Sequence, residues 1–224
     1  MQITSIDNAL AAVFGRYSGQ WRPADPLQKL IERMLGQRTT HSHVERALAN
    51  LSSRCRNWGD VAALPHDLLA DLIRPAGLAQ PKAARIHGVL EKILQDQGEY
   101  ALACLYEMEN RAATRYLLTM PGVGEHTAAL VLMFALGRPG VMPVDSHVHR
   151  VARRLGWAPH DATARAVQQA VEAAAPEQNL MDLHVNLVRL GERECGPGGT
   201  DCPNCPVSEQ CAAYLRRDQG PSAP

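Results

Sequence analysis

Four cysteines near the C-terminus form the most specific chemical pattern in this chain of 224 residues. Cys195, Cys202, Cys205 and Cys211 follow the spacing C-x6-C-x2-C-x5-C in a segment rich in Gly and Pro. Four thiolates suit zinc or an iron-sulfur cluster. Zinc sites usually contain two C-x2-C pairs, and only Cys202 and Cys205 form one here, so the spacing favours a 4Fe-4S cluster. Zinc remains an alternative, as do two disulfides, although disulfides are rare in the cytosol.

A carboxylate that could take part in a reaction, Asp145, precedes apolar residues at helical spacing in the segment VDSHVHRV, residues 144–151. The simplest interpretation of Asp145 is the N-cap of a helix, because Asp is among the preferred residues there. A cap at the mouth of a cleft is also a carboxylate on a rigid scaffold, where it can steer a cation or activate water. The two interpretations are compatible.

A tight turn lies between two helical segments in LTMPGVGEHTA, residues 118–128. The glycines Gly122 and Gly124 allow close approach, and backbone N–H groups at the start of the following helix can point at an anion. The backbone of this turn can therefore bind a phosphate oxygen without the help of a charged side chain. An ordinary connection between helices is an equally good interpretation of this turn alone.

The elements that must position these residues are predicted to be helices. Apolar residues recur at helical spacing almost throughout, and the alternation typical of strands is nearly absent. Asp25 and Pro26 mark one helix start, Pro81 another, and Gly98 and Gly191 the ends of two helices. We predict an all-α fold of about ten helices, with a structureless tail over 216–224.

Composition limits the possible classes of protein. The formal net charge is zero, so no strong overall field draws the molecule to nucleic acid. No apolar run reaches the length of a membrane span, and the N-terminus lacks a basic segment before its apolar stretch, so we expect a soluble cytoplasmic protein. Cys55 and Cys104 are interpreted as buried apolar residues. The only lysines are Lys29, Lys82 and Lys92.

Five segments together resemble the endonuclease III family of helix-hairpin-helix DNA glycosylases. They are MLGQRTT (34–40), GLAQPKA (77–83), LTMPGVGEHTA, VDSHVHRV and the cysteine set, in the order the family has them. The resemblance implies two helical lobes with a DNA-binding cleft between them. One is a six-helix lobe, 18–133, with the hairpin at 118–128. The other is a cluster lobe, 1–17 with 134–224, whose cluster loop spans 195–211.

The resemblance also implies a function and a set of site residues. The expected activity is excision of a damaged or mismatched base from double-stranded DNA by a monomer, after the nucleotide is flipped out of the stack. Asp145 matches the family's catalytic aspartate. The expected DNA contacts are Gln37 and Leu78, which enter the duplex, and the hairpin residues Gly122, Val123, Gly124 and Thr127. Taken alone, Leu78 would be interpreted as a core leucine and Gln37 as a solvated helix end.

The chain departs from the family pattern at His126, where bifunctional members carry a lysine. Only an amine can form the Schiff base that leads to strand cleavage, so His126 predicts a monofunctional glycosylase. His126 is retained as a candidate that binds substrate or the attacking water. Two alternatives stay open: a bifunctional glycosylase and AP lyase that uses another amine, and a catalytically weak protein that binds or senses damage.

A second departure is the loop 196–201, which lacks the cations that relatives place there. We therefore expect weaker DNA binding than in a typical relative. The arginines Arg150, Arg153 and Arg154 either compensate or form a solvated helix face. The excised base is not specified by the sequence; mismatched thymine or uracil is favoured because relatives without the lysine often act there.

Overall fold

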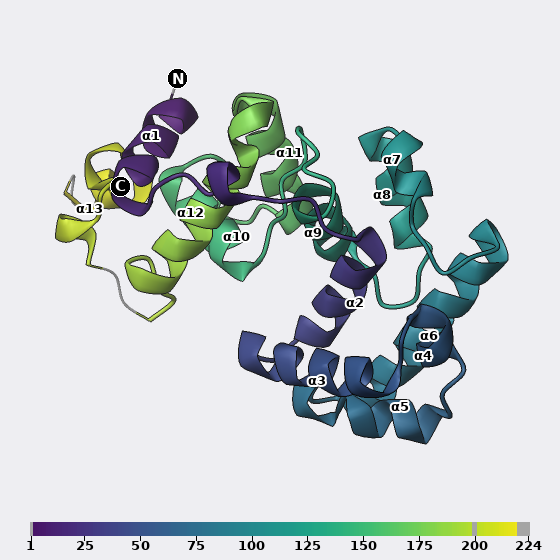
Figure 1. Cartoon of the computed structure of the whole chain (residues 1–224). Coiled ribbons are helices and arrows are strands. Elements are labelled where there is room, and N and C mark those ends of the chain that lie inside the picture. Colours follow the sequence, from purple (N-terminus) through teal and green to yellow (C-terminus); the bar gives the residue numbers. More distant parts are fainter. Residues whose placement is uncertain (1, 199–200, 219–224) are drawn as a thin grey trace. The chain divides into compact units, whose positions relative to one another are not determined.

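The computed structural model describes residues 2–198 and 201–218. All regular structure in these residues is helical, which confirms the all-α class (Figure 1). The chain forms two compact units: Pro23–Gly137, and the segments that precede and follow it. The lobes expected from the resemblance, with limits at 18 and 133, stay predictions. Within the described ranges, none of the helices combines the length and apolar character needed to cross a membrane.

The unit Pro23–Gly137 packs around the apolar helix α9. Its helices are α2 (Pro26–Gly36), α3 (His41–Arg54), α4 (Trp58–Ala62), α5 (His66–Leu72), η2 (Arg74–Ala76), α6 (Ala79–Gln97), α7 (Cys104–Glu107), α8 (Asn110–Leu118) and α9 (Glu125–Phe134). Helix α9 is buried from Thr127 to Met133 and packs on α2 and α8. Helix α2 begins as predicted, with Asp25 accepting a hydrogen bond of 2.6 Å from the Gln28 N–H.

The other unit is organised by α12, which packs against α1 and α10. Its elements are α1 (Gln2–Phe14), η1 (Ser18–Gln20), α10 (Ser146–Leu155), α11 (Ala164–Ala174), η3 (Glu177–Asn179), α12 (Leu180–Arg193), η4 (Cys202–Asn204), η5 (Ser208–Gln210) and α13 (Ala212–Asp218). The buried Asp182 of α12 accepts hydrogen bonds from the N–H and hydroxyl groups of Ser18, at 2.7 and 2.9 Å. Arg16 pairs with buried Asp7 at 2.8 Å. These polar contacts fix the N-terminal segment to α12.

The structure corrects three details of the predicted helices. Thirteen α-helices are present in the described ranges, more than the ten predicted, because α4 and α7 have only five and four residues. Gly98 ends α6 with φ +74°, as predicted, but Gly191 lies inside α12. The tail predicted to begin at Arg216 is helical up to Asp218, and residues 219–224 lie outside the described ranges.

Gly191 is a glycine because two helices meet there. A Cβ at this position would lie 2.8 Å from the Cβ of His147 on α10, which is closer than packed carbons approach. The glycine carbonyl also accepts a hydrogen bond of 2.8 Å from Arg150. Close packing of α10 on α12, and not a helix end, therefore accounts for this residue.

Candidate functional site

The predicted hairpin connects α8 to α9 and packs closely on α6. Gly122 has φ +77°, and a Cβ there would meet the side chain of Arg85 at 2.6 Å. Pro121 lies against Gly88, whose added Cβ would approach it to 3.1 Å. The backbone conformation therefore favours glycine at 122, and a side chain there would also displace that of Arg85.

The hairpin leaves backbone donors exposed at its glycines. Val123 is 7% exposed and donates its N–H to the Met120 carbonyl at 3.2 Å, so neither its side chain nor its N–H is available. Within the described part of the chain, the N–H groups of Gly122 and Gly124 have no hydrogen-bond partner. No side chain caps the start of α9, where Gly124 is the N-cap. The positive end of this helix is thus open to an anion.

His126 lies in the first turn of α9 and lines a polar cavity of about 270 Å³ within the same unit. The cavity brings together three predicted residues, Gln37, His126 and Thr127, of which Thr127 is buried. It also contains two residues that the sequence did not single out, Glu32 and Arg33. The guanidinium of Arg33 lies 5.7 Å from the centre of the Phe134 ring. The cavity is therefore lined by one carboxylate, one guanidinium and two imidazoles, those of His41 and His126.

Gln37 and Leu78 lie in two turns of the unit Pro23–Gly137. Gln37 is the C-cap of α2; its amide donates to the Gly122 carbonyl at 3.3 Å and accepts from Arg85 at 3.2 Å. It is therefore anchored to the hairpin and is not a freely solvated helix end. Leu78 is the N-cap of α6, with φ +48°, and is 56% exposed. The core interpretation of Leu78 is wrong.

Asp145 belongs to the other unit and caps α10. Its carboxylate accepts a hydrogen bond of 2.8 Å from the Val148 N–H, which confirms the N-cap, and the residue is half-buried. The segment that leads to it is fixed by buried His184, whose Nδ1 donates to the Pro143 carbonyl at 2.9 Å. Asp145 is thus a carboxylate on a rigid support, with one oxygen used for capping.

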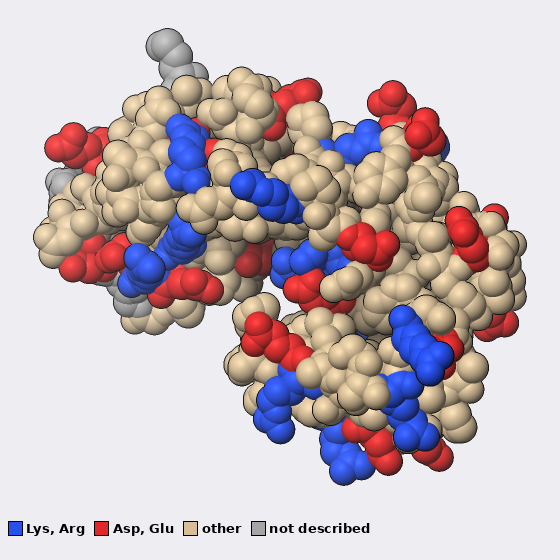
Figure 2. Space-filling model, in the orientation of Figure 1, with Lys and Arg blue, Asp and Glu red and all other residues tan. Residues whose placement is uncertain are grey.

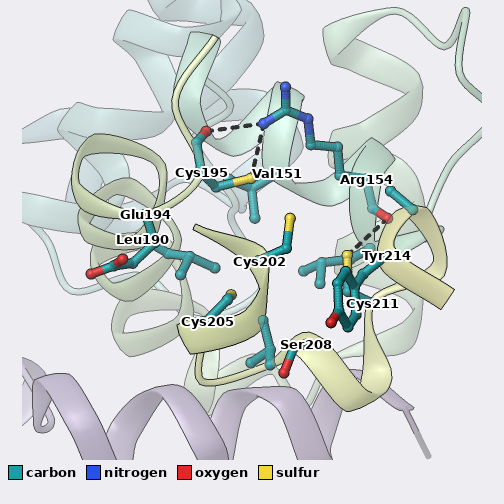
Figure 3. Close-up of a pocket in the computed structure, with 13 residues that line it drawn as sticks. Val151, Arg154, Leu190, Glu194, Cys195, Cys202, Cys205, Ser208, Cys211 and Tyr214 are labelled. Carbon is teal, nitrogen blue, oxygen red and sulfur yellow. Dashed lines mark hydrogen bonds between the residues drawn. The ribbon is translucent and has the colours of Figure 1, made fainter. Parts of the chain in front are cut away.

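The four cysteines of the C-terminal motif line one pocket, together with Val151 and Leu190 (Figure 3). None of these four cysteines is joined in a disulfide, so the described residues contain neither of the two disulfides considered above. Among the described residues, no three potential ligands are drawn together into a formed metal-binding group. Burial raises the pKa of the Cys205 thiol, and the other three cysteines raise it further. Four soft thiolates that share a partly buried pocket fit a cationic iron or zinc centre, which relieves this repulsion.

Two arginines of α10 hold the first cysteine of this pocket. Arg154 donates to the Cys195 Sγ at 3.1 Å (Figure 3). It also donates to the Gly196 carbonyl at 2.9 Å. Arg150 donates to the Cys195 carbonyl at 2.8 Å. These two arginines therefore do not form a solvated helix face. Their contacts were not predicted, because the residues they bind lie more than forty positions away in sequence.

All three lysines have defined partners. Lys29 Nζ lies 2.6 Å from Glu32, and Lys92 Nζ lies 3.0 Å from Asp96. Lys82 is buried and donates to three backbone carbonyls. Sequence reasoning gave Lys82 no role, although it stands in the GLAQPKA segment.

Comparisons with known proteins agree with this geometry. Residues 31–177 match the HhH-GPD superfamily of base excision DNA repair proteins. The chain is 30% identical to endonuclease III of Thermotoga maritima over 96% of both proteins. It is 26% identical to a thymine/uracil-DNA glycosylase of Methanothermobacter thermautotrophicus, over 87% of this chain and 85% of the relative. A trapped covalent endonuclease III–DNA intermediate superimposes with a TM-score of 0.78, at 28% identity and 97% coverage of both chains.

The helical fold and the hairpin are therefore those of endonuclease III. The chain belongs to the HhH-GPD superfamily of base excision DNA repair proteins, as an endonuclease III-like DNA glycosylase. This membership confirms the predicted family and the general activity.

Proposed function

We propose that this protein is a monofunctional glycosylase: it hydrolyses the N-glycosidic bond of a damaged or mismatched base in duplex DNA and leaves the strand intact. The observation that carries this proposal is the partnering of the amines. By the family resemblance, His126 stands where bifunctional members carry the catalytic lysine, and the ammonium groups of Lys29, Lys82 and Lys92 are all engaged. A protonated amine held by partners is not a nucleophile.

Asp145 is proposed to act on the sugar. As the base departs, positive charge develops at C1′, and a nearby carboxylate stabilises that charge. Water adds its oxygen to C1′ while the bond from C1′ to the base breaks. The water proton passes to the carboxylate or to the departing base. The Asp145 oxygen that does not cap α10 is the one available for this role.

We propose that the protein binds DNA through backbone N–H donors more than through Lys and Arg side chains. The free N–H groups of Gly122 and Gly124 suit phosphate oxygens, and Gln37 and Leu78 are proposed to fill the space left by the flipped nucleotide. On the face in Figure 2, Lys and Arg are interspersed with Asp and Glu, so no continuous basic face is visible there. With a loop that lacks cations at 196–201, binding should depend less on salt than in a relative with basic residues there.

We further propose that Cys195, Cys202, Cys205 and Cys211 hold a 4Fe-4S cluster. When bound, such a cluster supplies a rigid four-way cross-link and a redox-capable centre. Arg154, which donates to the Cys195 sulfur, would stabilise that thiolate as a ligand. The cysteines leave no ligand position for substrate, so the chain's own carboxylate and hairpin carry the reaction.

Replacing one cluster ligand should release the metal and loosen the C-terminal segment. For Cys202→Ala we expect iron to fall from about four atoms per chain to below one, because a three-cysteine site binds the cluster poorly. Residues 195–218 should then be cleaved faster by thermolysin, which cuts before apolar residues such as Val207 and Leu215, because metal binding contributes to local folding. Cys104→Ala, outside the pocket, is the matched control. If the wild type contained zinc and no sulfide, the four cysteines would be assigned to a zinc site and not to a cluster.

A panel of duplexes tests the monofunctional proposal. Oligonucleotides with uracil, thymine glycol, a G:T mismatch or 8-oxoguanine opposite adenine are incubated with the protein, with and without hot alkali. We expect breaks on at least one substrate only after alkali, because the product is an abasic site in an intact strand. Breaks that form without alkali would show lyase activity. Absence of breaks on every duplex would favour a binding or sensing protein.

A second candidate function, lyase activity through Lys29, has one observation in its favour. Glu32, the partner of Lys29, lines the cavity that contains His126, so Lys29 lies near this cavity, although the ion pair itself opposes loss of the lysine proton. Borohydride trapping distinguishes this candidate, since only an imine is reduced to a stable adduct. An adduct that disappears in Lys29→Met would assign the activity to this amine, and one that persists would direct attention to the N-terminus, which lies outside the described residues.

A further inference from the structure

A buried ammonium connects the two turns that carry Gln37 and Leu78. Lys82, in the first turn of α6, is 2% exposed. Its Nζ lies 2.6 Å from the Leu35 carbonyl oxygen, 2.9 Å from that of Gln37 and 2.8 Å from that of Ala76. An ammonium has three N–H donors, so all of its hydrogen-bonding capacity is used within this unit.

The Lys82 charge is held by helix ends. Leu35 lies in the last turn of α2 and Gln37 is its C-cap, so their carbonyls belong to the negative end of that helix. Ala76 contributes the carbonyl at the end of η2. Burial and the nearby Arg85 lower the pKa of Lys82. The three carbonyl acceptors oppose this effect, because they bind the charged form.

The turns that Lys82 joins contain unusual backbone conformations. Within the described ranges, the two residues other than glycine with positive φ are Arg38, at +58°, and Leu78, at +48°. Arg38 directly follows Gln37, and Leu78 follows Ala76 by two positions. A left-handed conformation is unfavourable for a residue other than glycine, so neighbouring contacts must maintain it. Lys82 donates to the carbonyl of Gln37, directly before Arg38, and to that of Ala76, two residues before Leu78.

Leu78 gains no packing from this conformation. Its side chain is 56% exposed, although leucine normally stabilises a fold by burial. Gln37 is fixed from the other side by the Gly122 carbonyl and Arg85. A strained backbone that presents an exposed apolar side chain is more readily explained by recognition than by stability.

We propose that Lys82 is a positioning residue that sets the spacing of the two DNA-penetrating turns, so that Gln37 and Leu78 enter the duplex together. The inference rests on the proposed function, because it assumes that these two side chains fill the vacated space. Without the ammonium, three buried carbonyls would lose their donor, and the Leu78 turn could relax to an ordinary conformation. Loss of the ammonium should weaken binding to DNA that lacks a base more than binding to an unmodified duplex.

The experiment compares Lys82→Met with Lys92→Met. Both substitutions lie on α6, but Lys92 is exposed at 30% and pairs only with Asp96. The probe is a duplex with a tetrahydrofuran abasic-site analogue opposite 2-aminopurine, with an unmodified duplex as reference. We expect the wild type to bind the probe tightly and to raise 2-aminopurine fluorescence as side chains enter the stack. Lys82→Met should bind the probe about tenfold more weakly, lose most of this signal and bind the unmodified duplex as before. Lys92→Met should match the wild type.

A double-mutant cycle with Leu78→Ala separates positioning from general destabilisation. If Lys82 acts through Leu78, Lys82→Met should cost about twofold or less in the Leu78→Ala background. The same tenfold loss in both backgrounds would overturn the proposal. So would a folded Lys82→Met with the wild-type binding ratio and fluorescence.

If Lys82→Met does not fold, Lys82→Arg provides the test, because it keeps a buried cation but cannot reproduce the three-carbonyl geometry. A loss of about threefold or more in probe binding is expected, and a wild-type ratio would again overturn the inference. Failure of the proposed function looks different: the wild type itself would not prefer the abasic probe and would release no base from any duplex.

Discussion

Asp145→Asn is expected to slow base release by about 10³-fold in single-turnover assays, equivalent to about 4 kcal/mol of transition-state stabilisation. The substitution removes the negative charge that opposes the developing cation at C1′. It keeps the N-cap, because Asn accepts the Val148 N–H as well as Asp does. The thermal unfolding midpoint and the affinity for an abasic duplex should therefore remain close to those of the wild type.

The matched control for this prediction is Asp25→Asn. Asp25 caps α2 with the same type of contact, a 2.6 Å hydrogen bond from the N–H three residues ahead, but it lies outside the VDSHVHRV segment that matches the family's catalytic aspartate. This variant should keep full activity. If Asp145→Asn retained activity within about tenfold of the wild type, the principal carboxylate would lie elsewhere. Glu32, in the His126 cavity, would be the next residue to replace.

The sequence was most informative where the structure is locally determined. Helical periodicity predicted the all-α class, and the caps at Asp25 and Asp145 were read correctly because a cap depends on residues only three positions apart. The tight turn at Gly122 was also predicted, and the φ of +77° at this residue is a property of the turn itself. Local chemistry is sufficient for each of these features.

The sequence was least informative where distant segments meet. Gly191 was interpreted as a helix end because glycine commonly terminates helices, but contact with His147 on α10 accounts for it. The burial of Lys82 could not be read locally, because two of its three carbonyl partners lie 45 and 47 positions away. The contact of Arg154 with the Cys195 sulfur is of the same kind. In all three cases a tertiary contact overrides the local preference of the residue.

His126→Lys is expected to convert the enzyme into one that forms a covalent intermediate. A lysine here would lie in the first turn of α9 and line the cavity beside Glu32 and Arg33. Arg33 would favour loss of the lysine proton, and Glu32 would oppose it. The free amine can attack C1′, expel the base and form an imine, whereas imidazole cannot. Borohydride should then trap a protein–DNA adduct at least about tenfold above the wild-type background, and strand breaks should form without alkali.

His41→Lys is the control for position in this experiment. His41 lines the same cavity, but its side chain is 78% exposed and it belongs to α3 and not to the hairpin. An amine at 41 should give no adduct, because covalent attack requires the reacting atoms to be held about 3–3.5 Å apart. If His126→Lys gave no adduct while base release continued, the hairpin position would not reach C1′ in this chain. Equal trapping by both variants would instead mean that any amine in the cavity suffices, and that the fold does not select position 126 for the reaction.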